Sequence, residues 1–259
     1  MVSLIVSFYK KTKNLDLILR GLSQQRFQDF ELIIAEDNDA KETISFLEEA
    51  RKKYSFPIKH VSQPDNGFQK CRILNKAIAL ATADYLVFFD DDCIPHRHFL
   101  KAHVENKKVK TLLFGRRVML SDKLTHRLYE NQDLSTLNIF NLIINNCKSI
   151  SYAFYLPFLH DRKHRQTGMW GCNWSIHKSD IEAVNGFDED FKSYGIGEDT
   201  DIEWRLLATG VRLKNIKFQA VQYHLSHPQN ASDVKENIEK MNQKKALNQV
   251  VAINGLSTL

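Results

Sequence analysis

The sequence predicts one α/β domain: a three-layer fold around a mixed, mainly parallel sheet, with a helical segment inserted into the second half. First, apolar runs of strand length alternate with amphipathic segments over the first hundred residues. Second, the links between these segments are short, which favours parallel crossover units. Third, 259 residues, 43% of them apolar, support one large core without a disulfide or a structural metal.

Each element of the first half follows from its own pattern. Val2–Phe8 is a nearly continuous apolar run, as in a strand buried on both faces. A helix is expected next, with Asn14 as its N-cap and an apolar stripe that includes Leu15 and Leu22. The remaining expected strands are Glu31–Ala35, Ile58–Val61 and Tyr85–Phe89, and the remaining expected helices are Lys41–Lys53 and Gln69–Ala81.

The alternation stops after Pro95. Thr111–Leu120 is expected to form a strand or a hairpin arm, and residues 121–168 an inserted, mobile segment outside the core, with helical pieces such as Leu134–Ile144. The helix expected at Glu198–Thr209 would end at Gly210, which suits the left-handed position after a helix. Other expected strands are Gly171–His177, Arg212–Lys217 and Gln219–His224, and other expected helices are Ser179–Asn185 and a tail at Val234–Ala252.

Composition and charge exclude several classes of protein. The four cysteines form no CxxC pair, which indicates reduced thiols in a cytoplasmic protein. We find no signal peptide and no run of about 18–20 apolar residues that could cross a membrane. The net charge of +5 is mostly dispersed, unlike that of nucleic-acid-binding proteins. Its densest patch, Arg162–Arg165, is either a solvated surface or a site of attraction to an anionic membrane face or a phosphorylated substrate.

Asp90, Asp91 and Asp92 directly follow the expected strand Tyr85–Phe89. Ligands bind outside the carboxyl ends of parallel strands, and three adjacent carboxylates repel one another unless a cation compensates them. Carboxylate oxygens suit Mg²⁺ or Mn²⁺. The alternative is an acidic loop that caps the next helix.

Further polar groups should lie along the same edge of the sheet. Ser7 and Tyr9 follow the first strand, Asp37 follows the second, and Arg72 lies on the next crossover helix. Together they predict a nucleotide site, although each alone could be an ordinary turn or surface residue. The GxxxxGK[ST] and GxGxxG phosphate-binding motifs are missing.

A second group of carboxylates lies in the run GIGEDTD, at the start of the expected helix Glu198–Thr209. Glycines there would let a ligand approach the backbone, whereas simple capping of the helix by its acidic residues is the alternative. A helix N-terminus lowers the pKa of a carboxylate, which opposes a role as a base unless burial offsets it. His96, His98 and His103 are assigned to the surface of the helix after Pro95.

Three runs, VSLIVSFYK, FQDFELIIAEDN and FFDDDCIP, together resemble the donor half of glycosyltransferase family 2, which has the GT-A fold. The runs GCNWSIHKSDIEAVNGFDEDF and GEDTDIEWRL resemble a galactosyltransferase-like C-terminal module. The resemblance covers residues 1–100 and about 168–228. It implies a donor-binding half at 1–104 and a catalytic acceptor half at 169–228. Outside these we expect a variable insert for acceptor or membrane contact at 105–168 and a helical tail at 229–259.

The resemblance also implies roles for individual residues. Asp90 and Asp92 match the family's metal-binding Asp-x-Asp motif, and His224 matches a histidine that completes the metal shell. Asp199 would be the base, with Glu198 binding a sugar and Trp170 as a platform for a sugar ring. On the donor side, Ser7 and Tyr9 would lie near the uridine, Asp37 at the imide of the base, Arg72 at the nucleotide, and Asp91 or Asp90 near the ribose and sugar.

The implied enzyme is an inverting glycosyltransferase that requires Mn²⁺ or Mg²⁺. It would move galactose or N-acetylgalactosamine from a UDP-sugar to a surface glycan, free or lipid-linked, with no nucleic-acid partner. Peripheral contact with the inner face of the membrane is compatible with the charge. The rival hypotheses are a protein that binds a sugar nucleotide or glycan without turnover, and a nucleotidyltransferase.

Overall fold

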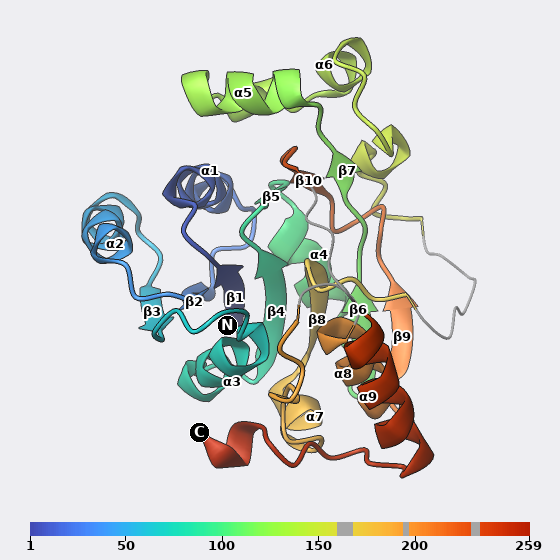
Figure 1. Cartoon of the computed structure of the whole chain (residues 1–259). Helices are drawn as coiled ribbons and strands as arrows, with labels where there is room; N and C mark the ends of the chain where they lie inside the picture. The colour runs from blue at the N-terminus through green and yellow to red at the C-terminus, as the bar shows by residue number, and fades with distance from the viewer. Residues whose placement is uncertain (160–167, 194–196, 229–233) are drawn as a thin grey trace.

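The computed structural model describes residues 1–159, 168–193, 197–228 and 234–259 (Figure 1). Within these residues, seven strands form one sheet in the order β3-β2-β1-β4-β8-β6-β9. They are β1 (Val2–Phe8), β2 (Phe30–Glu36), β3 (Ile58–Ser62), β4 (Tyr85–Asp90), β6 (Thr111–Phe114), β8 (Asn173–His177) and β9 (Arg212–Asn215). All pairs are parallel except those of β8, which runs antiparallel to β4 and β6. The expectation of a mixed, mainly parallel sheet in a single domain is confirmed.

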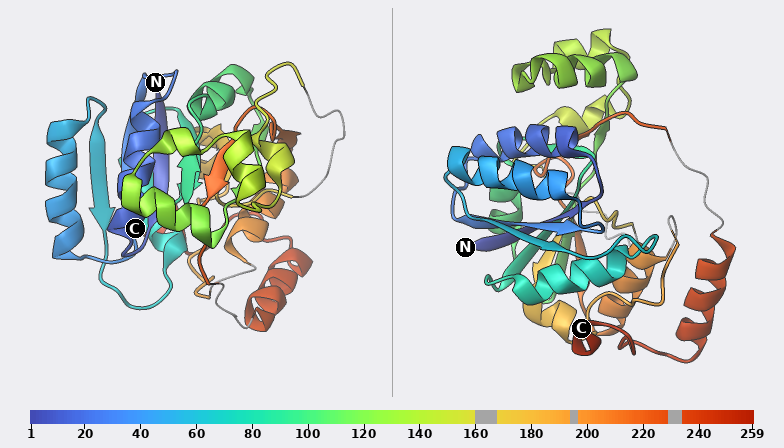
Figure 2. Two further views of the ribbon diagram at one scale, coloured as in Figure 1. Left: turned by 90° about the horizontal axis from the view of Figure 1, so that it is seen from above. Right: turned by 60° about the vertical axis from the view of Figure 1, so that its left-hand side comes forward.

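Two apolar layers cover the sheet, so the fold has the three layers expected. On one face, Leu15, Leu47 and Phe99 pack from α1 (Thr12–Ser23), α2 (Lys41–Lys53) and α4 (Phe99–Asn106). On the other face, Ile73, Ile181 and Leu206 pack from α3 (Lys70–Leu80), α7 (Lys178–Glu182) and α8 (Glu198–Ala208). Figure 2 shows α1 and α2 on the side of the sheet opposite to α3.

The insert has its own apolar core, contrary to the expectation that it lies outside the core. It contains α5 (Asp122–Asn131), the short 3₁₀ turns η1 (Leu134–Thr136) and η2 (Ile150–Ala153), and α6 (Ile139–Ile144). Leu124, Leu128 and Leu142 pack there against Tyr223 of a second, three-stranded sheet. That sheet has the order β5-β10-β7, with β5 at Cys93–Pro95, β10 at Gln222–His224 and β7 at Val118–Met119. The expected hairpin arm Thr111–Leu120 is thus divided between two sheets.

Two polar assignments were wrong because distant residues hold the side chains. Asn14 does not cap α1, which begins at Thr12; it is buried, and its Oδ1 accepts a hydrogen bond from the Tyr129 hydroxyl of α5 at 2.6 Å. His103 is fully buried rather than on the helix surface, with ring nitrogens 2.7 Å from Ser175 Oγ and 3.2 Å from Asn173 Oδ1.

The C-terminal tail is also less helical than expected. Its helix α9 covers Lys235–Ala246, and a 3₁₀ turn, η3 (Leu256–Thr258), lies near the end of the chain. Among the described residues, none of the helices combines the length and the apolar composition needed to cross a bilayer.

Candidate active site

A cleft of about 850 Å³ lies at the carboxyl edge of the large sheet. Its walls are the ends of β1, β2 and β4, the first turn of α3, residues 170–172 and the N-terminus of α8. His224 at the end of β10 and residues 227–228 after it complete the lining. The register of β1 and β4 pairs Ser7 with Asp90, so the two side chains meet at this edge. Parallel pairing therefore brings together the strand ends that the sequence singled out.

The three aspartates after β4 have three different sets of partners. Asp90 Oδ1 accepts hydrogen bonds from Ser7 Oγ at 2.7 Å and Lys70 Nζ at 3.1 Å. Asp91 Oδ2 accepts one from the backbone N–H of Tyr9 at 2.9 Å, and burial together with the charge of Asp92 raises its pKa to about 7. Separate partners thus relieve part of the repulsion between the carboxylates.

Asp92 forms a cluster with two histidines. Its Oδ2 lies 3.0 Å from His224 Nε2 and 3.1 Å from His227 Nε2. Burial raises the pKa of Asp92, but the hydrogen bonds to the two histidines outweigh burial and hold it well below the usual range. One donor atom from each of the three residues lies within 4.8 Å of the others.

This cluster fits a divalent ion. One carboxylate and two imidazoles converge, and the mixed oxygen and nitrogen set suits Mn²⁺ better than Mg²⁺, which prefers oxygen ligands. Asp90 lies outside the cluster, so its role as a metal ligand stays a prediction. The sequence interpretation chose His224 and left out His227; the spacing YHLSH across the strand end was the signal for both.

Glu198 and Asp199 begin α8 and face the same cleft. Burial, with the charge of Asp199, raises the pKa of Glu198 to about 7, and burial also raises the pKa of Asp199. Raised pKa values suit a general base better than the lowered values expected at a helix N-terminus. Asp199 Oδ2 accepts a hydrogen bond from Gly171 N at 2.7 Å. The preceding Gly195 and Ile196 lie outside the described residues.

Lys70 is the cation between the two acidic groups, and the sequence interpretation missed it. Its Nζ lies 3.1 Å from Asp90 Oδ1 and 3.8 Å from Glu198 Oε1. Burial alone would lower the pKa of Lys70, but the carboxylates of Asp90, Asp199 and Glu198 raise it well above the usual range. Lys70 therefore stays charged and offsets part of the negative charge in the cleft.

Trp170 lies at the cleft with 43% of its surface exposed. The guanidinium of Arg116 covers its ring at 4.5 Å from the centroid. Glu203 of α8 accepts hydrogen bonds from the N–H groups of Gly168 and Met169, at 3.1 and 2.5 Å. Glu203 and Asp199 thus hold the backbone on both sides of Trp170.

Tyr9 and Asp37 also line the cleft. The Tyr9 hydroxyl donates to Asp65 at 3.1 Å, and the Tyr9 ring is 44% exposed. Asp37 is buried, and its two carboxylate oxygens accept from Gln63 Nε2 and from the backbone N–H of Gln69, both at 2.7 Å. A nucleobase that bound Asp37 would have to share its carboxylate oxygens with Gln63 and Gln69.

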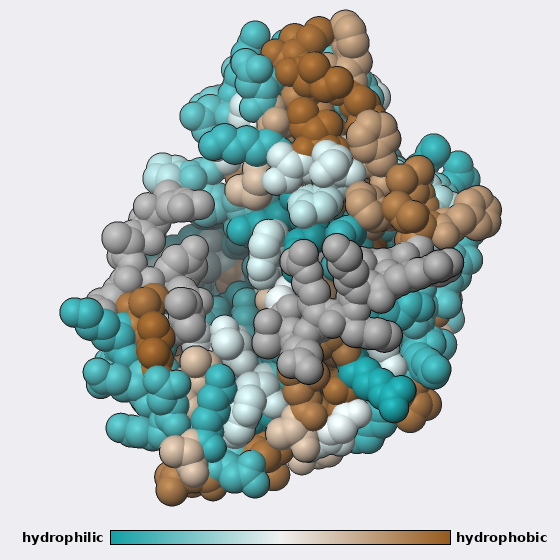
Figure 3. Space-filling view, turned by 90° about the vertical axis from the view of Figure 1, so that its right-hand side faces the viewer, coloured by the Kyte–Doolittle hydropathy of each residue, from teal (hydrophilic) through white to brown (hydrophobic). Residues whose placement is uncertain are grey.

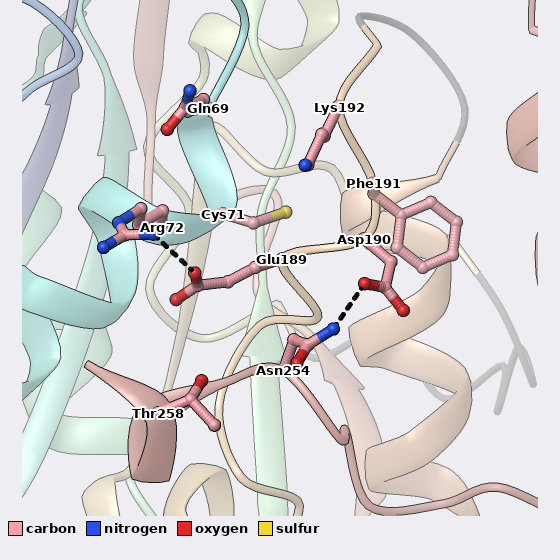
Figure 4. Close-up of a pocket in the computed structure, with 9 residues that line it drawn as sticks. All are labelled: Gln69, Cys71, Arg72, Glu189, Asp190, Phe191, Lys192, Asn254 and Thr258. Atoms are coloured by element: carbon pink, nitrogen blue, oxygen red, sulfur yellow. Dashed lines mark hydrogen bonds and ion pairs between the residues drawn. The ribbon is translucent and has the colours of Figure 1, made fainter. Parts of the chain in front are cut away.

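Arg72 lies in a different pocket, of about 320 Å³ (Figure 4). Its guanidinium pairs with Glu189 at 3.7 Å, and Gln69 and Cys71 of the same helix turn face this pocket. Lys70 and Ile73 face the cleft instead. The structure does not bring Arg72 together with the other candidate residues. The basic residues Arg162–Arg165 lie outside the described residues.

The mixed, mainly parallel sheet has the GT-A fold, and the class of protein is that of the family 2 glycosyltransferases. The model of the family described as glycosyl transferase family 2 matches residues 3–181, and the chain belongs to this family. A second model, described as the N-terminal domain of galactosyltransferase, matches residues 158–228.

Individual proteins resemble this chain in sequence or in fold. A chondroitin synthase of Pasteurella multocida is 23% identical over 88% of this chain, which spans 25% of that protein. Among solved structures, S. aureus TarS in complex with UDP matches with a TM-score of 0.64 at 15% identity, over 99% of this chain and 67% of that one. The mannosyltransferase PcManGT of Pyrobaculum calidifontis, with GDP-Man and Mn²⁺, matches with a TM-score of 0.59 at 16% identity, over 88% and 58%.

Proposed function

We propose that this chain transfers a sugar from a UDP-sugar to a hydroxyl of a glycan acceptor, with inversion at the anomeric carbon, in the synthesis of a surface polysaccharide. The observation that carries the proposal is that the Asp92–His224–His227 cluster and the Glu198–Asp199 pair line one cleft. The UDP complex of TarS and the Mn²⁺ complex of PcManGT support the donor class and the metal. The galactosyltransferase match makes galactose and N-acetylgalactosamine the first donors to test.

On the donor side, residues 1–104 would supply the nucleotide contacts. Ser7, Tyr9 and Asp37 would hold the uridine at the ends of β1 and β2. A metal held by Asp92, His224 and His227 would supply Lewis-acid stabilisation of the departing diphosphate. Lys70 lies beside Asp90 and would add a fixed positive charge near the leaving group.

On the acceptor side, residues 169–228 would orient the attacking hydroxyl. The Gly171 N–H holds Asp199 Oδ2, which leaves Oδ1 for the acceptor proton. Attack from the side opposite to the diphosphate would turn an α-linked donor into a β-linked product. Glu198, whose pKa is about 7, would bind the acceptor or donor sugar beside it. Trp170 would present an aromatic face to the acceptor ring.

The test is the release of UDP from a panel of UDP-sugars with soluble acceptors, with Mn²⁺ and with EDTA. Sugar-dependent UDP release that EDTA stops is expected from at least one donor. Binding of Mn²⁺–UDP with no release from any donor would instead identify a binding protein. Release of pyrophosphate from a nucleoside triphosphate would identify a nucleotidyltransferase.

The ligand set predicts a preference among metals. After EDTA treatment, Mn²⁺ is expected to restore more UDP affinity and more transfer than Mg²⁺ at the same free concentration, because two of the three donors are imidazole nitrogens. Calorimetric titration of UDP with each metal measures this. Equal recovery with both ions would argue for an all-oxygen site centred on Asp90 and Asp92.

Lys70 and Arg72 form a matched pair on one helix turn. Lys70→Ala is expected to lower kcat/KM by about 10–100-fold, or about 1.4–2.8 kcal/mol of transition-state free energy, since it removes the charge that faces Asp90 and Glu198. Arg72→Ala is expected to change kcat/KM little, because the half-exposed ion pair between Arg72 and Glu189 contributes about 0–1 kcal/mol. Steady-state kinetics with a melting-temperature control measure both. A larger loss of kcat/KM in Arg72→Ala than in Lys70→Ala would support Arg72 as the nucleotide contact.

A further inference from the structure

The insert exposes an unusual number of large apolar side chains. On α6, Phe140, Ile143 and Ile144 are 71%, 58% and 55% exposed. Past η2, Phe154, Leu156, Phe158 and Leu159 are exposed as well, Phe158 to 93%. We name these seven side chains the insert's apolar surface. Figure 3 shows apolar residues gathered at the top of the molecule and along the upper right of the same face.

On α6 most apolar side chains face outward, whereas a solvated helix exposes its polar side chains. Leu142 alone among its apolar side chains is buried, in the core that the insert shares with the small sheet. The polar side chains bond locally: Asn138 Oδ1 caps the helix by accepting from Asn141 N at 3.0 Å, and Asn145 Nδ2 donates to Asn141 O at 2.8 Å. The outward apolar groups therefore add nothing to the packing of the described residues.

Charge distinguishes the kinds of partner that could cover this surface. The segment Leu134–Leu159 has a single charged side chain, the exposed Lys148, and no carboxylate, in a chain that is 26% charged. The backbone N–H of Leu156 is bonded to Phe218 O at 2.8 Å, which brings the neighbouring Lys217 to the same region. Within this segment an anionic surface would meet Lys148 and no carboxylate, and the exposed Asp133 lies just before it.

The depth at which the different side chains lie also favours a bilayer. Phe and Ile or Leu side chains are outermost, while Tyr152 and Tyr155 are half-buried behind them. Apolar groups that enter the acyl region, with tyrosines and lysines at the headgroup level, are typical of proteins that lie on a membrane. Interfaces between proteins are enriched in Trp, Tyr, Phe, Met and Arg, and of these the segment Leu134–Leu159 contains only Phe and Tyr.

We propose that the insert's apolar surface docks on a phospholipid bilayer that contains anionic lipids. The chain that leads into α5 passes the metal cluster, where Leu120 donates its N–H to His224 O at 2.9 Å. Docking would hold the metal cluster near the membrane, where a lipid-linked acceptor would lie. This purpose rests on the proposed function, whereas the docking itself does not.

Vesicle sedimentation tests the docking. The full chain is spun with vesicles of equal parts phosphatidylglycerol and phosphatidylcholine, and without vesicles. We expect the wild type to sediment with the vesicles, and the triple variant Phe140→Ser, Ile143→Ser, Ile144→Ser to bind at least about tenfold more weakly, since three exposed side chains would no longer enter the apolar region. All three positions are exposed, so the fold should persist.

A matched control separates this surface from general hydrophobicity. The variant Leu247→Ser, Val251→Ser, Ile253→Ser removes three side chains that are 76%, 52% and 67% exposed and lie in the C-terminal tail, outside the insert. It should bind vesicles as the wild type does. Unchanged melting temperature and Mn²⁺–UDP affinity in both variants would show that the fold is intact.

Three results would overturn the proposal. The first is that the wild type does not sediment with vesicles. The second is that the two triple variants bind vesicles equally well. Alternatively, equilibrium sedimentation without lipid could show a wild-type dimer that the α6 variant dissolves, which would make the surface an interface between two copies. Because none of these assays needs sugar transfer, a failure of the proposed function leaves the docking result readable.

Discussion

Asp199→Asn is expected to lower the rate of sugar transfer by about 10²–10⁴-fold, the usual contribution of a general base. The substitution keeps the shape of the side chain, and its amide oxygen can still accept the hydrogen bond from Gly171 N, which is 2.7 Å from Asp199 Oδ2. What it loses is the ability to take the proton of the acceptor hydroxyl. Affinity for Mn²⁺–UDP should stay close to that of the wild type, since the bound nucleotide is assigned to other residues.

Single-turnover transfer and calorimetric UDP binding measure the two quantities separately. Glu198→Gln is the matched control, because Glu198 is the neighbouring carboxylate and has a raised pKa as well. A larger loss in Glu198→Gln than in Asp199→Asn, at equal UDP affinity, would move the base to Glu198. Near-normal turnover of Asp199→Asn would rule out Asp199 as the base.

Asp92→Ala should weaken metal-dependent UDP binding by at least about 10–100-fold, the loss that even outer-shell partners of a metal cause. Asp92 is the carboxylate that both histidines approach, at 3.0 and 3.1 Å, so its removal leaves two imidazoles without their shared partner. Transfer should fall with it, because the diphosphate loses its stabilising charge.

Titration of UDP in Mn²⁺ and in EDTA measures this effect. In EDTA the wild type and Asp92→Ala should bind UDP with similar, weak affinity. Glu49→Ala, on the exposed surface of α2, is a control that removes a carboxylate far from the cluster and should bind as the wild type does. If Asp92→Ala kept its response to Mn²⁺, the metal would bind elsewhere.

The strands were the most predictable elements of the fold. β1, β2 and β4 lie between helices on both faces of the sheet, so their sequences are nearly continuous apolar runs whose ends are easy to find. Asn14 and His103 were not predictable, because their partners, Tyr129 and Ser175, are 115 and 72 positions away in the chain. The sequence pattern of a single helix holds no information about such contacts.

In the candidate site, the residues at strand ends were predictable and the residues on helix α3 were not. Strand ends such as Ser7 and Asp90 were found because parallel strands bring their carboxyl ends to one edge. Arg72 was chosen and Lys70 was missed, since successive residues turn by about 100° around a helix and the rotation of α3 was unknown. Only the structure shows that Lys70 faces the cleft and Arg72 the smaller pocket.

The two carboxylates of α8 that hold the loop around Trp170 have a mechanical consequence. Asp199 and Glu203 lie about one helical turn apart and grip the backbone at Gly171 and at Gly168–Met169. The backbone on both sides of Trp170 is therefore tied to α8, and a movement of this loop relative to α8 would break these hydrogen bonds. A sugar ring stacked on Trp170 would lie at a fixed distance from Asp199. That distance would determine which hydroxyl of the sugar reaches the base and reacts.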